Sequence, residues 1–224
     1  MGEIKKIIII GTGGHSKVVL SEILQSPSYK ALGFVDNFQP QGTIIDKDNN
    51  LEVLSSIENM NSVIDDDTYG IVAIGSNFLR RKVVDEVESI NKNFKWATVI
   101  STNAIIDNNA NINEGSIIVA GSIINTGTNI KKHCIINTNT SIDHDNIFNE
   151  FSSTGPSVTT GGSVSIGALT HIGINSAISN NVSIGTNTVI GGKSFVNKNC
   201  DDDSVYYGVP IKKIKNRKED ESYL

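Results

Sequence analysis

The most constraining feature of this sequence is a six-residue period that runs over residues 100–196. Fifteen of the seventeen positions spaced six apart in this range are apolar, whereas 38% of the whole chain is hydrophobic, and Thr154 and Thr160 are the two exceptions. A period of six is a multiple of the strand period of two and does not fit the 3.6-residue period of a helix. The segment is therefore predicted to consist of strands and turns.

A second periodic feature specifies the shape of these strands. Most positions four residues after an apolar one are small: Ala104, Ala110, Ser116, Ser122, Thr128, Cys134, Thr140, Ser152, Thr170, Ser176 and Thr188. Short strands that meet at tight corners around a narrow interior explain this pattern, which is typical of the hexapeptide repeats of a parallel β-helix. Three hexads close one triangular coil, so we expect about five to six coils stacked ~4.8 Å apart. The usual preference for right-handed crossovers does not by itself determine the hand.

The composition excludes several classes of function. A net charge of −5 and a pI near 5.4 argue against a nucleic-acid surface, which would need a basic stripe. The apolar run over residues 7–10 is too short for a signal sequence, and no stretch approaches a membrane span. Cys134 and Cys200 lack metal-site or disulfide spacing, which favours reduced thiols in a cytoplasmic protein without a metal.

The first part of the chain has a different pattern. Strands are expected over residues 4–10, 31–35 and 70–74, and helices over 18–24 and 80–90. Alternating strands and helices predict a small parallel sheet with ligand loops at the carboxyl ends of its strands. We therefore expect an α/β domain of Rossmann-like type over 1–95, a β-helix domain over 96–205 and a C-terminal tail over 206–224. The charged part of this tail, over 212–224, is expected to be solvated.

A glycine-rich loop follows the first expected strand. Its pattern, Gly11-x-Gly13-x-x-Ser16, lacks the last glycine of the dinucleotide fingerprint, although Asp36 lies near the distance expected for a ribose contact. Half of a dinucleotide fold suits a mononucleotide, with a diphosphate near the loop amides and the helix N-terminus. The alternative is that the glycines only make a tight turn between strand and helix.

Together, several motifs resemble one family. IIIIGTGGHSKVV, FVDN, AIGSN followed by Arg80-Arg81, INTNTSIDHDNIF, HIGINSAI, VIGGK and YYGVPIKKI are similar to bacterial nucleotide-sugar acetyltransferases, which are grouped with sialic acid O-acetyltransferases. The resemblance covers nearly the whole chain. It implies a left-handed β-helix, acetyl-CoA as the acetyl donor, a nucleotide-linked 4-amino-6-deoxyhexose as acceptor, and a homotrimer with its sites at subunit boundaries.

His144 is the candidate general base. It lies two residues after the inward Ile142, which places it near a corner of the prism, and stacking arithmetic places Thr126 and Gly162 one coil away. The neighbouring Asp145 can favour the imidazolium and so raise the basicity of the ring. The residues alone also allow a surface turn histidine between solvated aspartates. The resemblance assigns His144 as the base and Asp145 as the group that tunes it.

The resemblance also assigns the binding residues. It places Gly13, Gly14, His15, Asp36, Asn37 and Gly75 at the nucleotide sugar, and Ser153, Ile174 and Gly192 at acetyl-CoA. Ser153 stands where many relatives carry a second histidine, in an F-x-H pattern, and its hydroxyl offers a weaker, neutral hydrogen bond there. Of the remaining histidines, His133 is expected in an exposed turn and His171 on the outer face of a strand. A local distortion is expected near Thr154 and Thr160.

These features predict an acetyl-CoA-dependent N-acetyltransferase that acts on the C4 amine of a nucleotide-linked 4-amino-4,6-dideoxyhexose for surface glycan biosynthesis. UDP or dTDP sugars are preferred by resemblance. The alternatives are a sialic acid O-acetyltransferase and a non-catalytic nucleotide-binding hexapeptide-repeat module. No metal, nucleic acid or membrane partner is expected.

Overall fold

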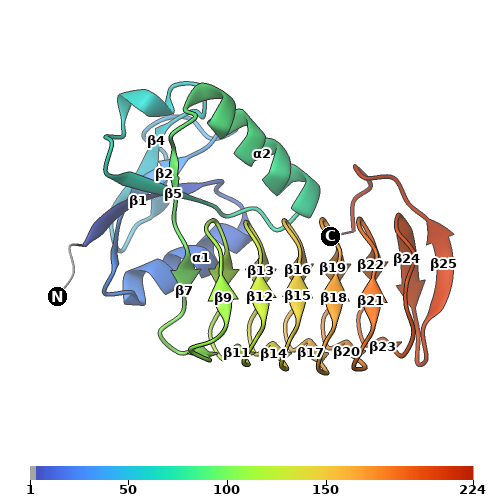
Figure 1. Ribbon diagram of the computed structural model, residues 1–224. Helices are drawn as coiled ribbons and strands as arrows, with labels where there is room; N and C mark the ends of the chain where they lie inside the picture. The colour runs from blue at the N-terminus through green and yellow to red at the C-terminus, as the bar shows by residue number, and fades with distance from the viewer. Residues whose placement is uncertain (1–3, 224) are drawn as a thin grey trace.

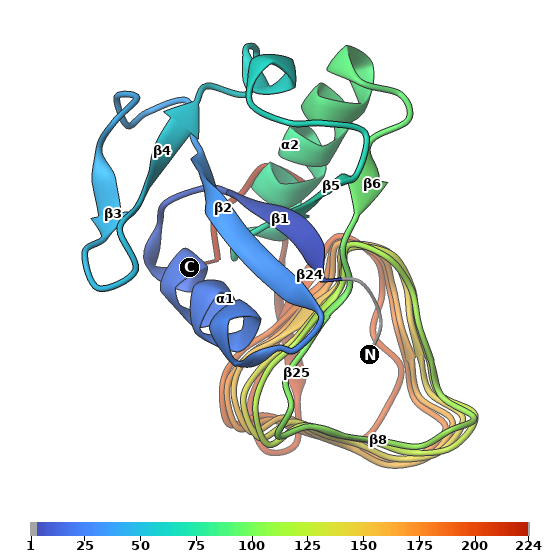
Figure 2. The same ribbon diagram turned by 90° about the vertical axis from the view of Figure 1, so that its left-hand side faces the viewer.

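The computed structural model describes residues 4–223, which form an α/β layer followed by a triangular β-helix (Figure 1). The predicted fold class is confirmed: a small parallel sheet precedes a left-handed parallel β-helix built from hexapeptide repeats. Viewed along the prism in Figure 2, the α/β layer lies over one edge of the triangle. The α/β layer and the first coils of the β-helix share one hydrophobic core.

The sheet of the α/β layer has six strands in the order β3-β4-β2-β1-β5-β6. All neighbouring pairs are parallel except the outer β3–β4 pair. The strands are β1 (Lys5–Ile10), β2 (Tyr29–Val35), β3 (Ile44–Asp46), β4 (Leu51–Ser55), β5 (Thr68–Val72) and β6 (Lys95–Trp96). The three expected strands are β1, β2 and β5. The other three were not predicted: β3 and β6 have only three and two residues, and all three lie toward the two edges of the sheet.

Two helices cover opposite faces of this sheet, and a short 3-10 turn, Met60–Ser62, follows β4. α1 (Gly14–Gln25) begins four residues before the expected start, directly after the glycine loop. Its apolar side packs between the sheet and the outer side chains of the first coils, in a cluster that includes Ile23 and Ile117. α2 (Asn77–Ile90) covers the other face and is capped by the Ser76 side chain, which accepts a hydrogen bond from the Leu79 N–H. Ser76 thus fixes where the helix begins.

Three parallel sheets form the faces of the β-helix. The first contains β7 (Val99–Ile100), β10 (Ile117–Ile118), β13 (Ile135–Ile136), β16 (Ser153–Thr154), β19 (His171–Ile172) and β22 (Val189–Ile190). The second contains β8 (Ile105–Ile106), β11 (Ile123–Ile124), β14 (Ser141–Ile142), β17 (Thr159–Thr160), β20 (Ala177–Ile178) and β23 (Phe195–Val196). The third contains β9 (Asn111–Ile112), β12 (Asn129–Ile130), β15 (Ile147–Phe148), β18 (Ser165–Ile166) and β21 (Ser183–Ile184). Partners differ by 18 residues, which confirms three hexads per coil.

The periodic apolar residues fill the prism, as predicted, and form one continuous core. The 18-residue stacking is kept at Thr154 and Thr160, but the ladder is locally altered there, as predicted: β13 pairs with β16 at Ile135 and Ser153 only, without a pair at Thr154. The hydroxyl groups of the two threonines accept hydrogen bonds from the N–H groups of Asn137 at 2.9 Å and Asp143 at 3.2 Å. A threonine is tolerated inside the prism because its buried oxygen has partners there.

A hairpin of β24 (Ser204–Tyr207) and β25 (Lys212–Asn216) closes the end of the prism. The chain after β25 then runs back toward α2 (Figure 1). Arg217 is only 7% exposed, and the Tyr223 ring stacks on His171. The expectation of a solvated end is therefore wrong for Arg217 and Tyr223, which bind the body of the protein, whereas residues 218–220 are exposed.

Candidate active site

The glycine loop opens into a pocket of about 690 Å³ between the sheet and α2. Gly11 has a φ of 102°, a conformation that favours glycine, and Gly13 is the N-cap of α1. The floor is apolar and the rim is polar. The lining residues are Ile10, Gly11, Thr12, Gly13, Val35, Asp36, Asn37, Phe38, Ile57, Ile74, Leu79, Lys82, Val83, Asp85 and Glu86. A pocket with this lining suits a flat organic ring next to a loop of backbone amides.

Asp36 and Asn37 both line this pocket and are held rigidly. The Asp36 carboxylate accepts hydrogen bonds from the N–H and hydroxyl of Thr12, at 2.9 and 2.8 Å, and from the N–H groups of Phe38 and Gln39. It therefore ties the end of β2 to the glycine loop. The Asn37 side chain accepts from the Ile57 N–H at 2.8 Å and donates to Glu86 across the pocket at 3.3 Å.

Phe38 is a pocket residue that the sequence analysis did not single out. Its side chain is 93% exposed although it is large and apolar. The sequence feature that could have identified Phe38 is its position directly after the Asp36-Asn37 pair, at the end of a strand of the parallel sheet.

His15 and Gly75 lie near the pocket but do not line it. The Nε2 atom of His15 is buried and has no hydrogen-bond partner among the described residues. Burial, together with the nearby Arg80 guanidinium, lowers the pKa of His15 to about 4, so the ring is neutral. Gly14 is the first residue of α1, and its surroundings leave space for a ligand, because no described atom lies within 4 Å of an added Cβ.

Arg80 joins the α/β layer to the β-helix. Its side chain is fully buried, and its guanidinium donates to the carbonyl groups of His133 and Phe151, both at 2.9 Å, and to that of Ile74 at 3.0 Å. It forms no ion pair with any described carboxylate. Burial lowers the pKa of Arg80 to about 10, so the group keeps its charge at neutral pH.

His133 is part of this junction rather than of an exposed turn. The side chain is only 3% exposed; its ring stacks on Phe151 and meets Trp96 edge to face. Burial and Arg80 lower the pKa of His133 to about 3. The expectation of exposure is wrong because the α/β layer covers this corner of the prism.

The predicted base lies at another corner of the prism, between β14 and β15. His144 Nδ1 lies 2.9 Å from Oδ2 of Asp145, and the side chain of His144 is 53% exposed. The hydrogen bond that Nδ1 donates to Asp145, followed by the charge of Asp143, raises the pKa of His144 above its ordinary 6.5. Engagement of Nδ1 leaves Nε2 as the atom that can accept a proton.

The stacking prediction around His144 is confirmed. The Asp145 N–H donates to the Thr126 carbonyl at 3.0 Å, in the preceding coil. In the following coil, a Cβ on Gly162 would lie 2.5 Å from Nε2 and Cε1 of His144. Glycine at 162 therefore leaves the room that the ring occupies.

The three residues predicted at acetyl-CoA lie on the first face and the edge that follows it. Ile174 is 55% exposed, and a Cβ on Gly192 would lie 3.0 Å from its Cγ2 atom, so these two residues are neighbours in successive coils. Ser153 is only 3% exposed, and its hydroxyl lies 2.8 Å from Nδ1 of His171. The structure therefore brings Ile174 and Gly192 together at the surface, whereas Ser153 is buried against His171.

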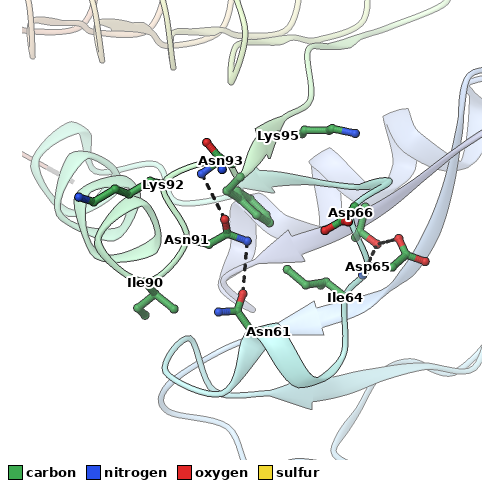
Figure 3. Close-up of a pocket in the computed structure, with 11 residues that line it drawn as sticks. Asn61, Ile64, Asp65, Asp66, Ile90, Asn91, Lys92, Asn93 and Lys95 are labelled. Atoms are coloured by element: carbon green, nitrogen blue, oxygen red, sulfur yellow. Dashed lines mark hydrogen bonds between the residues drawn. The ribbon is translucent and has the colours of Figure 1, made fainter.

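A second hollow, of about 640 Å³, lies at the opposite end of the sheet (Figure 3). Asn91 donates to Asn61 at 3.4 Å, and Lys6 pairs with Asp65 at 2.5 Å. The hollow contains none of the predicted site residues. Over residues 4–223, no group of three or more metal-ligating side chains and no helix able to span a membrane is found.

Comparisons with known proteins agree with this arrangement. Residues 6–87 match the family model of the PglD N-terminal domain. Perosamine N-acetyltransferase from Caulobacter crescentus, solved as a variant with CoA and GDP-perosamine, shares 25% identity with a TM-score of 0.85, over 96% of this chain and 99% of that one. The acetyltransferase domain of PglB from Neisseria gonorrhoeae, solved with acetyl coenzyme A, shares 25% identity and a TM-score of 0.85, over 95% and 100%.

WeeI from Acinetobacter baumannii shares the fold, at 22% identity and a TM-score of 0.77 over 93% of this chain and 99% of that one. No curated protein sequence matches this chain significantly.

Proposed function

Since this chain is an acetyltransferase of the bacterial nucleotide-sugar group within the hexapeptide-repeat family, we propose that it transfers an acetyl group from acetyl-CoA to the C4 amine of a nucleotide-linked 4-amino-4,6-dideoxyhexose. One observation carries the proposal. A glycine-loop pocket and a hexapeptide prism with an Asp145-bound His144 occur in one chain that matches CoA-bound sugar N-acetyltransferases over nearly its whole length.

His144 is the proposed general base. The neutral amine attacks the thioester carbonyl carbon, so that a C–N bond forms and the C–S bond breaks. The amine proton passes to Nε2 of His144, and the coenzyme leaves as a thiolate that takes up a proton. Asp145 holds the ring with its proton on Nδ1 and stabilises the imidazolium that forms. Such a base contributes typically ~10² to 10⁴ in rate.

The base and the pocket belong to different copies of the chain in this proposal. The α/β layer covers the corner that carries His133, to which Arg80 of α2 binds, whereas His144 lies at the corner between the second and third faces. The outward residues of these two faces are uncharged: Ile105, Ile123, Ser141, Thr159, Ala177 and Phe195, then Asn111, Asn129, Ile147, Ser165 and Ser183. Uncharged faces of this size favour packing against further copies. We therefore propose a homotrimer in which a neighbouring copy supplies His144.

The acceptor is proposed to bind with its diphosphate at Gly13, Gly14 and His15 and its nucleoside near Asp36 and Asn37. The backbone amides of the loop and the N-terminus of α1 attract an anion. On the opposite side of the pocket, α2 presents Lys82, Asp85 and Glu86, a net negative set, which favours placing the diphosphate at the loop. Gly75 follows β5 on the same edge of the sheet. We keep UDP or dTDP as the preferred nucleotide, on family resemblance.

Acetyl-CoA is proposed to bind along the prism at Ile174 and Gly192, with Ser153 near the acetyl end. Exposed backbone at a close-packed glycine can bind the amides of the pantetheine arm. Because acetyl-CoA and nucleotide sugars are made in the cytoplasm, we propose that the enzyme acts there. The free thiols of Cys134 and Cys200 agree with a reducing compartment.

The test is the release of free thiol from acetyl-CoA, measured with UDP-, dTDP- and GDP-linked 4-amino-4,6-dideoxyhexoses and with N-acetylneuraminate. Release with one amino sugar, together with its acetylated product by mass spectrometry, supports the proposal and identifies the nucleotide. Release with N-acetylneuraminate alone would replace it with O-acetylation. No release with any acceptor would favour a binding module.

A further inference from the structure

One corner of the prism presents a column of backbone carbonyl groups to the α/β layer. His133, Phe151, Leu169 and Asn187 occupy equivalent positions 18 residues apart, each with a φ between 50° and 60°. Arg80 binds the carbonyls of the first two, and the Asn77 side chain donates to the carbonyl of Leu169 at 3.0 Å. Helix α2 therefore binds three successive coils through hydrogen bonds to their carbonyl groups.

The segment 217–223 binds the fourth coil in the same way, through the carbonyl group of Asn187. Arg217 donates to the carbonyl of Asn187 at 3.3 Å and to its side-chain oxygen at 2.6 Å. The same guanidinium also donates to the carbonyl of Glu221 and lies 5.5 Å from the ring centroid of Tyr223. An ion pair between Arg81 and Glu219 joins the segment to α2. The segment is thus attached to both parts of the molecule.

Tyr223 lies where the two parts meet. Its hydroxyl accepts the N–H of Asn77, the first residue of α2, at 2.8 Å and lies 3.4 Å from the Gly75 carbonyl, to which it donates. Its ring stacks on His171 with centroids 4.5 Å apart. His171 in turn bonds Ser153. One side chain therefore links the loop before α2, which belongs to the acceptor edge of the sheet, to the coils that carry the proposed acetyl site.

We propose that Tyr223 is a positioning residue for acetyl transfer, which fixes the nucleotide-sugar layer relative to the β-helix through Gly75 and Asn77 on one side and His171 on the other. This inference rests on the proposed function, since it concerns the same acceptor and acetyl sites. The fixed geometry matters because reaction rates depend steeply on alignment, and a displacement of about 1 Å can cost ~10²-fold in rate.

The proposal predicts a separation between binding and turnover. Every residue that lines the nucleotide pocket lies between Ile10 and Glu86, so the pocket forms without the segment 217–223. Loss of Tyr223 contacts should lower kcat and leave the affinity for a nucleoside diphosphate unchanged.

The experiment compares Tyr223→Phe and Tyr223→Ala with the wild-type enzyme. Tyr223→Phe removes the hydroxyl contacts with Gly75, Asn77 and Ser153 and keeps the ring on His171, whereas Tyr223→Ala removes the hydroxyl contacts and the ring stacking. We expect kcat to fall about 10-fold for Phe and about 100-fold for Ala, with the Kd for the nucleoside diphosphate within about twofold of wild type. Tyr69→Phe is the matched control, because its ring lies near Lys5 and Lys95 at the far end of the sheet and its hydroxyl has no hydrogen bond among those described. An unchanged kcat in Tyr223→Ala would overturn the proposal, and so would a raised kcat, which would make the segment inhibitory.

Amide hydrogen exchange separates this inference from the proposed function. In the unliganded protein, Tyr223→Phe should speed exchange at the Asn77 amide, while Tyr69→Phe should not. Unchanged exchange would show that the segment does not dock and would overturn the inference. If the wild-type enzyme acetylates none of the acceptors, the proposed function fails, whereas the exchange result still reports whether Tyr223 binds α2.

Discussion

Nδ1 of His144 lies 2.9 Å from Oδ2 of Asp145, its direct neighbour in the chain, and this contact fixes which nitrogen of the ring is free. The contact is possible because Asp145 has a φ of 57°, which turns the chain at the corner and folds the carboxylate back toward the ring. The corner geometry of the prism and the basicity of the proposed base therefore have one structural origin.

Replacing Asp145 with Asn should shift the pH profile of kcat/KM. The Asp145 hydrogen bond raises the pKa of His144, and a base acts only when it is deprotonated, so activity rises as pH increases through that pKa. In Asp145→Asn the pKa falls, and the acidic limb should move to lower pH. Asn tolerates a positive φ well, so the fold should persist. If the acidic limb of Asp145→Asn stays at the wild-type pH, the limb does not report the titration of His144.

Replacing His144 with Ala should remove the proton acceptor. We expect kcat to fall by ~10² to 10⁴-fold, while nucleoside diphosphate binding by calorimetry stays unchanged, because His144 is not part of the pocket lining. Full turnover in His144→Ala would exclude His144 from the mechanism.

Gly162→Ala tests the space around the ring. A Cβ at 162 would lie 2.5 Å from Nε2 of His144 and must displace the imidazole, so kcat should fall while nucleotide affinity is kept. Gly161→Ala is the control for strain in the coil, since its Cβ would meet the backbone nitrogen of Asn180 at 2.8 Å rather than the histidine. Equal loss of activity in both variants would attribute the effect to coil strain.

Stability should decrease with acid because three neutral histidines surround Arg80. Burial, and then the charge of Arg80, lowers the pKa of His15 to about 4, of His133 to about 3 and of His171 to about 4. In the unfolded chain these histidines bind protons near the ordinary pKa of 6.5. The stability that depends on their neutral form is therefore complete above that pH, and it decreases as the pH falls toward the lower pKa values of the folded protein. Denaturant melts from pH 7 to pH 4 should show this loss, and His133→Phe should reduce it. A flat profile would show that the rings are protonated within the fold.

The β-helix could be predicted from the sequence because each hexad places an inward residue, mostly isoleucine, at the same position. The period of six therefore specifies the architecture. It also predicted His144 with Thr126 and Gly162, since stacking by 18 residues is arithmetic. It failed for His133 and for the segment 217–223 because their burial depends on contacts between distant parts of the chain. Arg80 lies 53 residues before the carbonyl it binds, and a local sequence pattern does not indicate a contact over that separation.

Phe38 provides a test of the nucleoside end of the pocket. Its N–H is held by Asp36 Oδ1 at 2.7 Å, so the loop is fixed, while the ring is 93% exposed at the rim. An exposed aromatic ring beside an apolar floor suits stacking on a base, which contributes ~1 to 3 kcal/mol. Phe38→Ala should therefore raise the Kd for the nucleoside diphosphate by about 5- to 150-fold and leave kcat at saturating acceptor unchanged. Phe38→Tyr should bind like wild type, because it keeps the stacking face. If calorimetry shows equal affinity for wild type and Phe38→Ala, the ring does not contact the base, and its exposure must have another cause, such as a contact between copies of the chain.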